Sequence, residues 1–474
     1  MTQARLATCI PLPIEEKTLV TVIDKAKDWA LMHGVGMRDR KHFDKDSIQI
    51  APFVLLPSPF PRTEFNKAIE LQPILNELMH KVAHDDEFLQ HTLQNALQVD
   101  EFTASLYEIY MKVKEEGITQ PTSLGLFRSD YLMQQPDSNR IKQVEFNTVA
   151  SSFGAITSNL PYILRQLGHG DLIKHMPENR ALSGLCAGII EAYDLFGVPS
   201  AVVIFVVEEV SYNICDQRFH EFEISEKRPD IQIYRKTLNE IYEETDLNNK
   251  KQLGRPVAVV YYRSGYEPQQ YPTAREWDAR LRVERSNAIK CPSIQYQLAG
   301  TKKVQQALAA PGALEKFMGG GAPTSRVRDI FTGLYSLDFD EGGEKAVEMA
   351  IADAERFVLK PQREGGGNNI YGAEVRDALL RMRHSRERAA YILMERILPP
   401  LVAGYVVRPG AAVPPPVTDL VSELGIFGVI IGSKDHIISN KHVGHMLRTK
   451  LADANEGGVA AGLGALDSPY LLDM

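Results

Sequence analysis

The chain has 474 residues, about three times the length of a typical domain, so it has room for two or three folding units and a buried substrate site. Hydrophobic residues make up 44% and charged residues 24%, with 34 Gly and 27 Pro, which excludes a collagen-like, low-complexity or mostly disordered chain. The formal net charge of −8 argues against a large basic surface, so we expect no nucleic-acid partner.

Membrane and secretion signals are not evident in the sequence. The longest apolar stretch, at 198–207, covers about ten residues, whereas crossing a bilayer takes roughly 20. The N-terminus lacks the basic start and apolar core of a secretory signal. The cysteines form no C-x-x-C pair, as is typical of reduced thiols; they are Cys9, Cys186, Cys215 and Cys291. We therefore expect no membrane contact and a cytoplasmic location.

The first half of the chain shows helical and then strand-like periodicity. Residues 19–117 carry apolar residues three and four apart, which predicts a helical section whose last helix begins after Asp100 and ends at Gly117. Polar and apolar residues alternate at 123–133 and 141–155, which predicts two strands joined by a turn.

Helical and strand patterns then alternate. Helices are expected at 160–168 and 182–196, and apolar runs at 200–209 and 256–266 are interpreted as buried strands flanked by helices. That alternation is typical of a parallel sheet, and we place an α/β unit at 199–300.

The C-terminal third contains two stretches rich in Gly and Pro, at 319–325 and 399–419, which we expect outside element interiors, as in a hinged flap. Five arginines between them could form an anion site. A solvated helix face is the preferred interpretation, because the arginines spread round the helix. They are Arg376, Arg381, Arg383, Arg386 and Arg388.

Several common enzyme motifs are absent from the sequence. It has no Gly-Lys dipeptide and hence no Walker A loop, and no G-x-G-x-x-G, H-E-x-x-H or G-x-S-x-G. What stands out is KPQREGGGNNIYG, which follows an apolar strand. Its glycines let backbone N–H groups approach an anion, Lys360 offers a charge to phosphate, and Glu364 offers an oxygen ligand to a divalent cation. The alternative is a surface hairpin loop.

Two oxygen-bearing side chains share a strand face in VEFNT. Glu145 and Asn147 are two residues apart and therefore point the same way. Together with Glu364 they could hold Mg²⁺, which favours a few protein oxygens plus nucleotide phosphates. The alternative is a polar solvent face of an edge strand.

Further basic residues follow in two blocks. In LAGTKKVQQ, Lys302 or Lys303 could reach phosphate near a helix start, although paired lysines are usually just solvated. In NKHVGHMLRTK the H-x-x-H pair has no further ligand at zinc spacing, so we expect no zinc site. Arg448 and Lys450 share a strand face and could bind a carboxylate and a phosphate.

Taken together, the blocks resemble one family. LGLFRSDY, VEFNT-x-x-SSFG, DQR, YYRSGY, QLAGTKKVQQ, FVLKPQREGGGNNIYG, ILMERI, SELGIFGV and NKHVGHMLRTK followed by GGVAAG are similar, in order, to eukaryotic glutathione synthetases. The resemblance implies a mixed α/β ATP-grasp fold with a helical N-terminal section, an inserted parallel-sheet substrate domain and a mobile lid. It implies domains at 1–198, 199–300 and 301–474, with the lid at 335–420, and a homodimer.

The resemblance also implies the reaction: an ATP-dependent carboxylate-amine ligase joins γ-glutamylcysteine to glycine through an acyl phosphate, giving glutathione, ADP and phosphate. Positioning and charge neutralisation suffice for such a transfer, so no protein nucleophile is needed. Two Mg²⁺ ions per site are implied, bound with ATP and held by Glu145, Asn147 and Glu364. Arg128, Arg448 and Lys360 are the implied catalytic residues.

The implied binding residues fall into two groups. The ATP site would comprise Glu145, Lys302, Lys360, Glu364, Gly365, Gly366, Gly367, Asn369, Tyr371, Met394, Glu395, Ile397, Glu423, Lys450 and Glu456. The substrate site would comprise Arg128, Val149, Ala150, Ser151, Ser152, Ser211, Tyr212, Asn213, Gln217, Arg263, Ser264, Gly265, Tyr266, Arg448, Val459 and Ala460. The chain departs from the family's usual residues at Ala150, at Glu456, which replaces Asp, and around 211–213.

Two alternative functions make different demands on the sequence. Another ATP-grasp ligase would share the phosphate and magnesium residues but would lack the blocks YYRSGY and RTK followed by GGVAAG, which are present. A non-catalytic ATP-binding module would be expected to have lost a metal ligand or Arg128, and all of these are retained.

Overall fold

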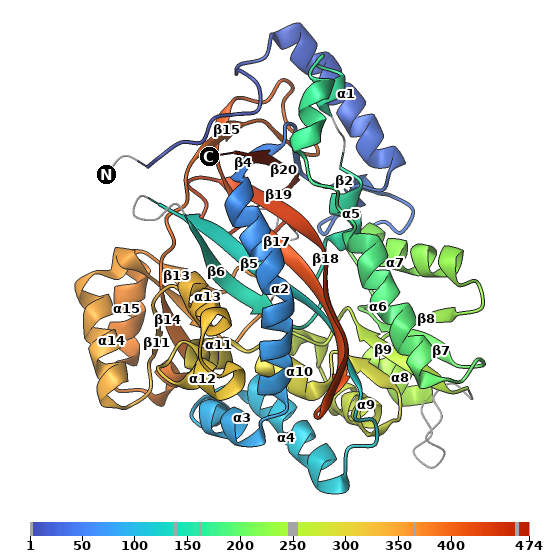
Figure 1. Cartoon of the computed structure of the whole chain (residues 1–474), viewed down its shortest axis with the longest axis vertical. Helices are drawn as coiled ribbons and strands as arrows, with labels where there is room; N and C mark the ends of the chain where they lie inside the picture. Colours follow the sequence, from blue (N-terminus) through green and yellow to red (C-terminus); the bar gives the residue numbers. More distant parts are fainter. Residues whose placement is uncertain are drawn as a thin grey trace.

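The computed structural model describes residues 3–135, 140–160, 163–244, 255–364, 366–459 and 464–473. Within these ranges twelve strands form one large curled sheet and four form a smaller one, with helices on both faces of the large sheet (Figure 1). The mixed α/β class predicted from the sequence is confirmed. None of the helices in the described ranges is long and apolar enough to cross a membrane.

The N-terminal section is helical, as predicted. It contains α1 (Glu16–Met32), α2 (Arg62–Ala83), α3 (Asp86–Leu93) and α4 (Glu101–Glu116). Asp100 caps α4 by accepting from the Thr103 N–H, and Gly117 ends the helix with φ +89°. Four short strands were missed, since two to four residues are too few to show alternation: β1 (Gly36–Met37), β2 (Gln49–Ile50), β3 (Phe53–Val54) and β4 (Ser58–Pro61).

The large sheet has an antiparallel centre and a parallel wing. The centre consists of β5 (Ser123–Gln134), β6 (Arg140–Asn147), β17 (Thr418–Ser433) and β18 (His436–Leu451). The wing consists of β7 (Val202–Val206), β8 (Gln232–Lys236), β9 (Val257–Tyr262) and β10 (Ile289–Cys291). The predicted hairpin and the predicted parallel strands are both confirmed, and the wing joins the centre where β10 pairs with β5.

The edge of the sheet is built from segments distant in sequence. It contains β3, β15 (Val402–Gly404), β16 (Val406–Val407) and β19 (Gly464–Asp467), while β20 (Pro469–Leu472) pairs with β4. The stretch at 399–419, predicted to lie outside elements, therefore contributes two short strands. Edge strands tolerate neighbouring prolines because one row of their backbone groups is unpaired.

Both faces of the central strands are buried, which explains their long apolar runs. On β17, Leu424, Ile426 and Ile430 belong to the core under α2. The intervening Phe427 and Val429 belong to the core on the other face. That second core is covered by α6 (Ala181–Phe196), the helix predicted at 182–196.

The remaining helices connect and cover the strands. They are α5 (Gly154–Ser158), α7 (Ile214–Lys227), α8 (Leu238–Glu244), α9 (Ala274–Arg285), α10 (Ile294–Ala299), α11 (Lys302–Leu308), α12 (Ala313–Met318) and α13 (Ala322–Ile330). The Gly/Pro-rich stretch at 319–325 enters α13, whose proline sits in the first turn, where its missing N–H costs nothing. The helix predicted at 160–168 is wrong, because only a 3₁₀ turn at Ile163–Arg165 forms in its described part.

The smaller sheet has its own core. It is formed by β11 (Leu334–Ser336), β12 (Phe357–Pro361), β13 (Ile370–Tyr371) and β14 (Tyr391–Glu395), and α14 (Glu341–Ala352) and α15 (Ala373–Met382) pack against it. This unit lies to one side of the central strands (Figure 1).

The solvated-face interpretation of the five arginines is wrong for Arg388. Its side chain is fully buried, forms an ion pair with Glu344 and lies over the Phe339 ring at 3.8 Å from the ring centroid. The reason is that α15 ends before Arg388, so this residue does not follow the solvent-facing pattern of the helix.

Candidate active site

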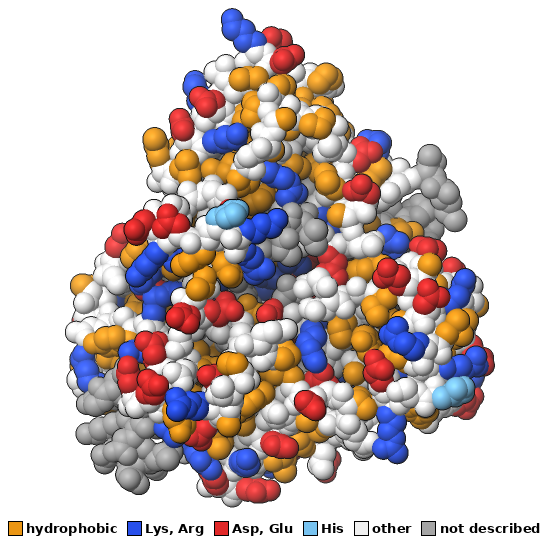
Figure 2. Space-filling model, turned by 180° about the vertical axis from the view of Figure 1, so that it is seen from behind, with side chains coloured by type: hydrophobic (Ala, Val, Ile, Leu, Met, Phe, Trp, Pro, Cys, Tyr) orange, Lys and Arg blue, Asp and Glu red, His pale blue; other side chains and the backbone are white. Residues whose placement is uncertain are grey.

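A cavity of about 330 Å³ opens where the small sheet faces the large one. Seen from behind, the molecule is hollowed at the centre of this face, and Lys and Arg side chains gather there (Figure 2). Its floor consists of β6, β5, β17 and β18, in that order. Arg128 on β5 lies opposite Asn147 on β6, and Glu423 on β17 lies opposite Arg448 on β18. Adjacent strands thus bring distant charged residues onto one surface.

Arg448 connects the carboxylates of this floor. Its Nε donates to Glu423 Oε1 at 3.0 Å, and its Nη2 lies 3.5 Å from Asp130 Oδ2 and 4.0 Å from Glu145 Oε1. Burial alone would lower the pKa of Arg448, but the three carboxylates raise it above its ordinary value. Burial raises the pKa of Glu423, although Arg448 acts in the opposite direction.

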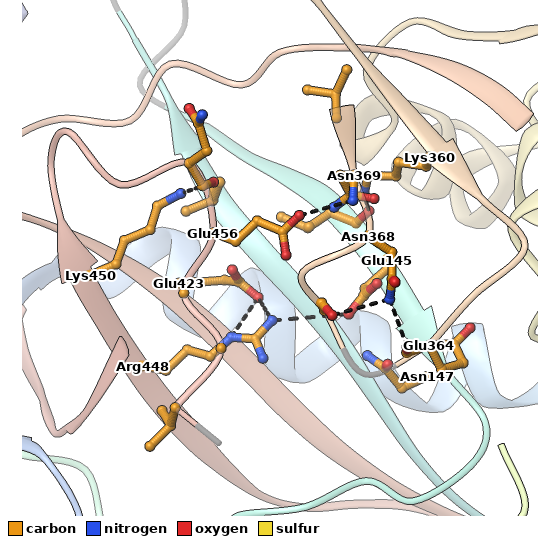
Figure 3. A pocket seen from close by; sticks show the side chains of 18 of the residues that line it. Glu145, Asn147, Lys360, Glu364, Asn368, Asn369, Glu423, Arg448, Lys450 and Glu456 are labelled. Carbon is orange, nitrogen blue, oxygen red and sulfur yellow. Dashed lines mark hydrogen bonds and ion pairs between the residues drawn. The ribbon is translucent and has the colours of Figure 1, made fainter. Parts of the chain in front are cut away.

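Lys302 lies between two carboxylates. Its Nζ is 2.9 Å from Glu364 Oε1 and 3.1 Å from Glu145 Oε2. Burial opposes ionisation of Glu145, yet the ammonium groups of Lys302 and Lys360 bring its pKa well below the usual range. Burial raises the pKa of Glu364. Two carboxylates that converge on one cation have the arrangement of metal ligands (Figure 3).

The donor set fits Mg²⁺ that binds together with phosphate. Glu145, Asn147 and Glu364 all line the cavity and offer hard oxygens, and the Lys302 ammonium shows that a cation fits between the two carboxylates. In the part of the chain that the structure describes, no three His, Cys, Asp or Glu side chains cluster as a metal site. An ion held by so few protein oxygens needs further ligands from phosphate and water.

The small sheet supplies the opposite wall. Lys360, at the end of β12, is buried and donates from Nζ to the Val144 carbonyl at 2.8 Å. Burial lowers the pKa of Lys360 below its ordinary value, although Glu145 acts in the opposite direction. Lys360 therefore bridges the two sheets and sits beside the Glu145 carboxylate.

The glycine-rich loop is tied to the segment after β18. Glu456 accepts hydrogen bonds from the backbone N–H groups of Gly367 and Asn369, the latter at 3.1 Å. Gly366 and Gly367 have φ of +74° and +81°, a region that favours glycine. The Glu456 side chain thus reaches the loop.

An apolar slot lies beside this loop. Met394 and Ile397 are buried, and Met394 pairs with Val358 across β14 and β12. The neighbouring Glu395 also lines the cavity and forms an ion pair with Arg356. Apolar side chains flanked by convergent polar groups suit a flat heteroaromatic ring.

The chain after β6 forms the other end of the cavity. The Ser152 carbonyl accepts from Arg128 Nη1 at 3.1 Å, and the Ser152 hydroxyl accepts from Arg263 Nη2 at 2.9 Å. Arg263 also donates to Asp216 at 2.8 Å. Ala150 has φ +50°, a strained conformation for a residue with a side chain, and it lines the cavity.

Arg235 lies behind the cavity lining and contacts two of the predicted substrate residues. It donates to Gln217 Oε1 at 2.7 Å and to the Ser211 hydroxyl at 3.1 Å, and Gln217 in turn donates to Asn213 at 2.8 Å. Asn213 lines the cavity, whereas Ser211 and Gln217 are buried behind it.

Most of the predicted site residues meet in this one cavity. Those that line it are Arg128, Glu145, Asn147, Val149, Ala150, Ser152, Tyr212, Asn213, Tyr266, Lys302, Lys360, Glu364, Gly366, Asn369, Tyr371, Met394, Glu395, Ile397, Glu423, Arg448, Lys450, Glu456 and Val459. Those described that lie outside its lining are Ser151, Ser211, Gln217, Arg263, Ser264, Gly265 and Gly367. Gly365 and Ala460 lie outside the described residues.

Sequence reasoning missed two charged residues at the substrate end. Arg40, from the loop between β1 and β2, lies over the Tyr212 ring at 4.9 Å from its centroid and lines the cavity. Glu208, just after β7, also lines it and accepts from Gln270 at 3.1 Å. No motif marks either residue; only a basic run around Arg40 could have drawn attention to its loop.

Comparison with known proteins matches the whole chain. The family model described as eukaryotic glutathione synthase, ATP binding domain, covers residues 16–471. Glutathione synthetase of Rattus norvegicus is 44% identical over 96% of this chain and 98% of the relative, and that of Xenopus laevis is 41% identical over 97% and 98%. The solved structure of a glutathione synthetase-like effector from Globodera pallida has a similar fold, with TM-score 0.78, 24% identity, and coverage of 98% of this chain and 100% of that one.

These matches, together with the charged cleft between two sheets, define the class: the protein is an ATP-dependent ligase. The match spans nearly the full length of both this chain and its relatives, so it is not confined to a shared nucleotide-binding unit. The chain belongs to the eukaryotic glutathione synthetase family.

Proposed function

We propose that this chain joins γ-glutamylcysteine to glycine at the expense of ATP. A carboxylate is a poor acceptor for an amine, because oxide would have to leave. In the proposed reaction the cysteinyl carboxylate therefore attacks the γ-phosphorus of ATP, which releases ADP and forms an acyl phosphate. The amine of glycine then attacks the acyl carbon and phosphate leaves; the nitrogen, neutral as it attacks, gives up one proton and keeps the other as the amide N–H of glutathione.

One observation carries this proposal: the carboxylates of Glu145 and Glu364 converge on Lys302, and Lys360 lies beside them. Such a group matches a triphosphate with bound cations, because each anion or cation of the ligand meets an opposite charge already in place. Mg²⁺, two ions per site, would be held by Glu145, Asn147 and Glu364, and would neutralise the phosphates.

The proposed nucleotide site runs from this group to the apolar slot. Lys302, Lys360 and the glycine-rich loop would contact phosphates, and the slot at Met394 and Ile397 would hold the adenine. Tyr371, Glu423, Lys450 and the other nucleotide-binding residues that the resemblance implies would complete it. Glu456, which already accepts from two N–H groups of the loop, would release them to phosphate.

The proposed dipeptide site lies at the other end. Arg128 would face the transferred phosphoryl group. Asp130 accepts from its Nε and Nη2, and the Ser152 carbonyl accepts from its Nη1, which leaves two N–H donors for the phosphoryl group. Arg448 would bind a substrate carboxylate. Ser211, Gln217 and Arg263 would act by holding lining residues such as Asn213 and Ser152 in place.

We also infer that the part of residues 335–420 that forms the small sheet acts as a lid, since β15 and β16, within the same range, belong to the large sheet. Much of this segment forms the small sheet with a core of its own, joined to the large sheet across the cavity by contacts such as that of Lys360. A unit with a separate core can move as a body.

We further propose an inserted substrate domain at 199–300, a homodimer and a cytoplasmic location. The four free thiols are compatible with a reducing compartment.

The deciding experiment measures ADP release with γ-glutamylcysteine, with and without glycine. We expect full turnover only with both, and [¹⁸O] transfer from the cysteinyl carboxylate to phosphate, since the acyl phosphate route carries one carboxylate oxygen into the product phosphate. Turnover with a different donor carboxylate in preference to γ-glutamylcysteine would indicate another ligase. Nucleotide binding without turnover of any amine would indicate a binding module.

A further inference from the structure

Asp130 is a buried carboxylate to which neither motifs nor the family resemblance assigned a role. Its side chain is fully buried on β5, at the floor of the cavity. Its oxygens accept from Arg128 Nε at 2.6 Å, from Arg128 Nη2 at 2.8 Å and from Asn147 Nδ2 at 3.1 Å. Arg448 Nη2 lies 3.5 Å away. All three partners are residues that line the cavity.

We propose that Asp130 is a positioning residue, which sets the orientation of the Asn147 amide and of the Arg128 guanidinium. The inference rests on the proposed function, in which Asn147 is a ligand of Mg²⁺. A side-chain amide can be flipped so that oxygen and nitrogen exchange places. What decides between the two orientations is the group that the amide faces, and here that group is a carboxylate, which only accepts hydrogen bonds.

The consequence for Asn147 follows from its contacts. Its nitrogen donates to Asp130 Oδ2 and to the Arg128 carbonyl at 3.4 Å, so both hydrogens point toward β5. The amide oxygen is thereby left for the cavity, on the side of Glu145, its neighbour two residues earlier on the same strand. The flipped amide would set its oxygen against the Asp130 carboxylate, which is repulsive.

The consequence for Arg128 is similar. Asp130 takes two of its five N–H donors in a fork, and the Ser152 carbonyl takes a third. The guanidinium is therefore fixed on three sides, and its remaining donors are available to a ligand. The packing beneath the pair is tight: a Cβ on Gly425 would lie 2.9 Å from both Asp130 Oδ1 and Arg128 Cδ. Glycine at this position lets β17 pass under the ion pair.

The test uses Asp130→Asn, which keeps the shape but can turn a donor toward Asn147. The readout is binding of Mn²⁺, with a non-hydrolysable ATP analogue, by electron paramagnetic resonance on the purified full chain. We expect Mn²⁺ affinity to fall at least about tenfold, the usual effect of losing a group that orients a ligand. The KM for glycine should change far less than kcat. Asp467→Asn, at a buried carboxylate outside the cavity lining, is the matched control and should bind Mn²⁺ normally.

A second variant exchanges the two side chains, so that the amide stands at position 130 and the carboxylate at position 147. Asp130→Asn combined with Asn147→Asp keeps one amide and one carboxylate in contact, with the carboxylate now facing the cavity. We expect Mn²⁺ affinity to recover in this double variant while kcat stays low, because Arg128 still lacks its fork. If the single variant does not fold, the double variant alone decides, and failure to bind Mn²⁺ contradicts the inference.

The outcomes separate this inference from the proposed function. Unchanged Mn²⁺ affinity in a folded Asp130→Asn would overturn the positioning role and leave the ligase proposal standing. Absence of Mn²⁺ binding in the unaltered protein with the ATP analogue would overturn both. Loss of affinity in proportion to a loss of folded protein, without recovery in the double variant, would show that Asp130 serves only stability.

Discussion

Lys302→Met offers a direct test of the charge arrangement in the cavity. Lys302 is buried and is the cation between Glu145 and Glu364. Methionine keeps an unbranched side chain of similar length but removes the charge. The variant therefore leaves two carboxylates that face one another, with Lys360, Arg448 and Arg128 as nearby cations.

The size of the effect follows from the distances. Each carboxylate has an oxygen within about 3 Å of the same nitrogen, so the two oxygens are at most about 6 Å apart. At an effective dielectric constant of about 20, two like charges at about 6 Å repel by about 3 kcal/mol. Both side chains are mostly buried, so solvent screens this repulsion only in part. With Lys302 in place, its attraction to both carboxylates offsets this repulsion; in the variant the repulsion is uncompensated, so we expect a loss of stability of about 3 kcal/mol at neutral pH.

The pH dependence has a definite sign. Burial raises the pKa of Glu364 in the folded protein, and loss of Lys302 removes a group that lowers it. A carboxyl with a raised folded pKa binds its proton more tightly when folded, so stability is regained as the pH falls through that pKa toward the unfolded value near about 4.3. The loss of stability in Lys302→Met should therefore be large at neutral pH and small in mild acid.

The assay is the apparent Tm in EDTA at neutral pH and in mild acid. The matched control is the double variant Lys302→Met with Glu364→Gln, in which one of the two facing charges is gone. We expect the single variant to melt well below the unaltered protein at neutral pH and the double variant to recover most of the loss. Equal Tm for the single variant and the unaltered protein, or a double variant less stable than the single one, would refute the reasoning.

Three further predictions concern the metal, the lid and a buried acid. Glu145→Gln or Glu364→Gln should reduce ADP formation at least about 100-fold with little change in Tm, because each removes a hard oxygen ligand; near-normal activity, or activity in excess EDTA, would contradict the magnesium assignment. An ATP analogue should slow hydrogen exchange across 335–420, and unchanged exchange at saturation would exclude a lid there. Burial raises the pKa of Asp467 to about 7, so its contribution to stability falls as the pH rises through about 7. In Asp467→Asn the Tm should depend less on pH as the pH rises toward about 7, and a Tm profile equal to that of the unaltered protein would contradict this.

The long elements of the fold were predictable because their signals are local. The helices of the N-terminal section and the strands at 123–133 and 200–209 repeat a pattern over many residues. The four short strands between α1 and α2 are too short to show such a pattern. β3 pairs with β16 and β19, and β4 with β20, which are distant in the chain, whereas β1 and β2 pair with each other. Such strands form because the sheet offers them hydrogen-bond partners, and not because of a pattern in their own residues.

The residues of the site also divide into those that a sequence motif reveals and those that only the fold brings to the cavity. Glu145, Asn147 and Lys360 could be found because each stands in a motif whose spacing has a chemical meaning. Arg40 and Glu208 could not, because they reach the cavity only through the placement of a loop and of a strand end. Their contacts arise from tertiary structure, which no local spacing encodes.

Arg388 shows the limit of a periodicity argument. Five arginines spread over thirteen residues look like a solvated helix only if one helix spans them all. The helix ends at Met382, and the chain then turns Arg388 inward, where Glu344 and the ring of Phe339 compensate its burial. A charge that is paired and stacked in this way can be buried, whereas an isolated one cannot.

The balance of charge in the cavity explains why metal and nucleotide should bind together. The carboxylates of Asp130, Glu145, Glu364 and Glu423 face Arg128, Lys302, Lys360 and Arg448, so these eight side chains sum to zero. ATP alone would add about four negative charges to a poorly solvated space, and two Mg²⁺ ions alone would add four positive ones. Bound together they would preserve neutrality, and in the proposed site the Lys302 ammonium would turn from the two carboxylates toward the phosphates. In this arrangement the same carboxylates would hold the lysine before binding and the metal afterwards, which is why removing the Lys302 charge should leave the two carboxylates uncompensated.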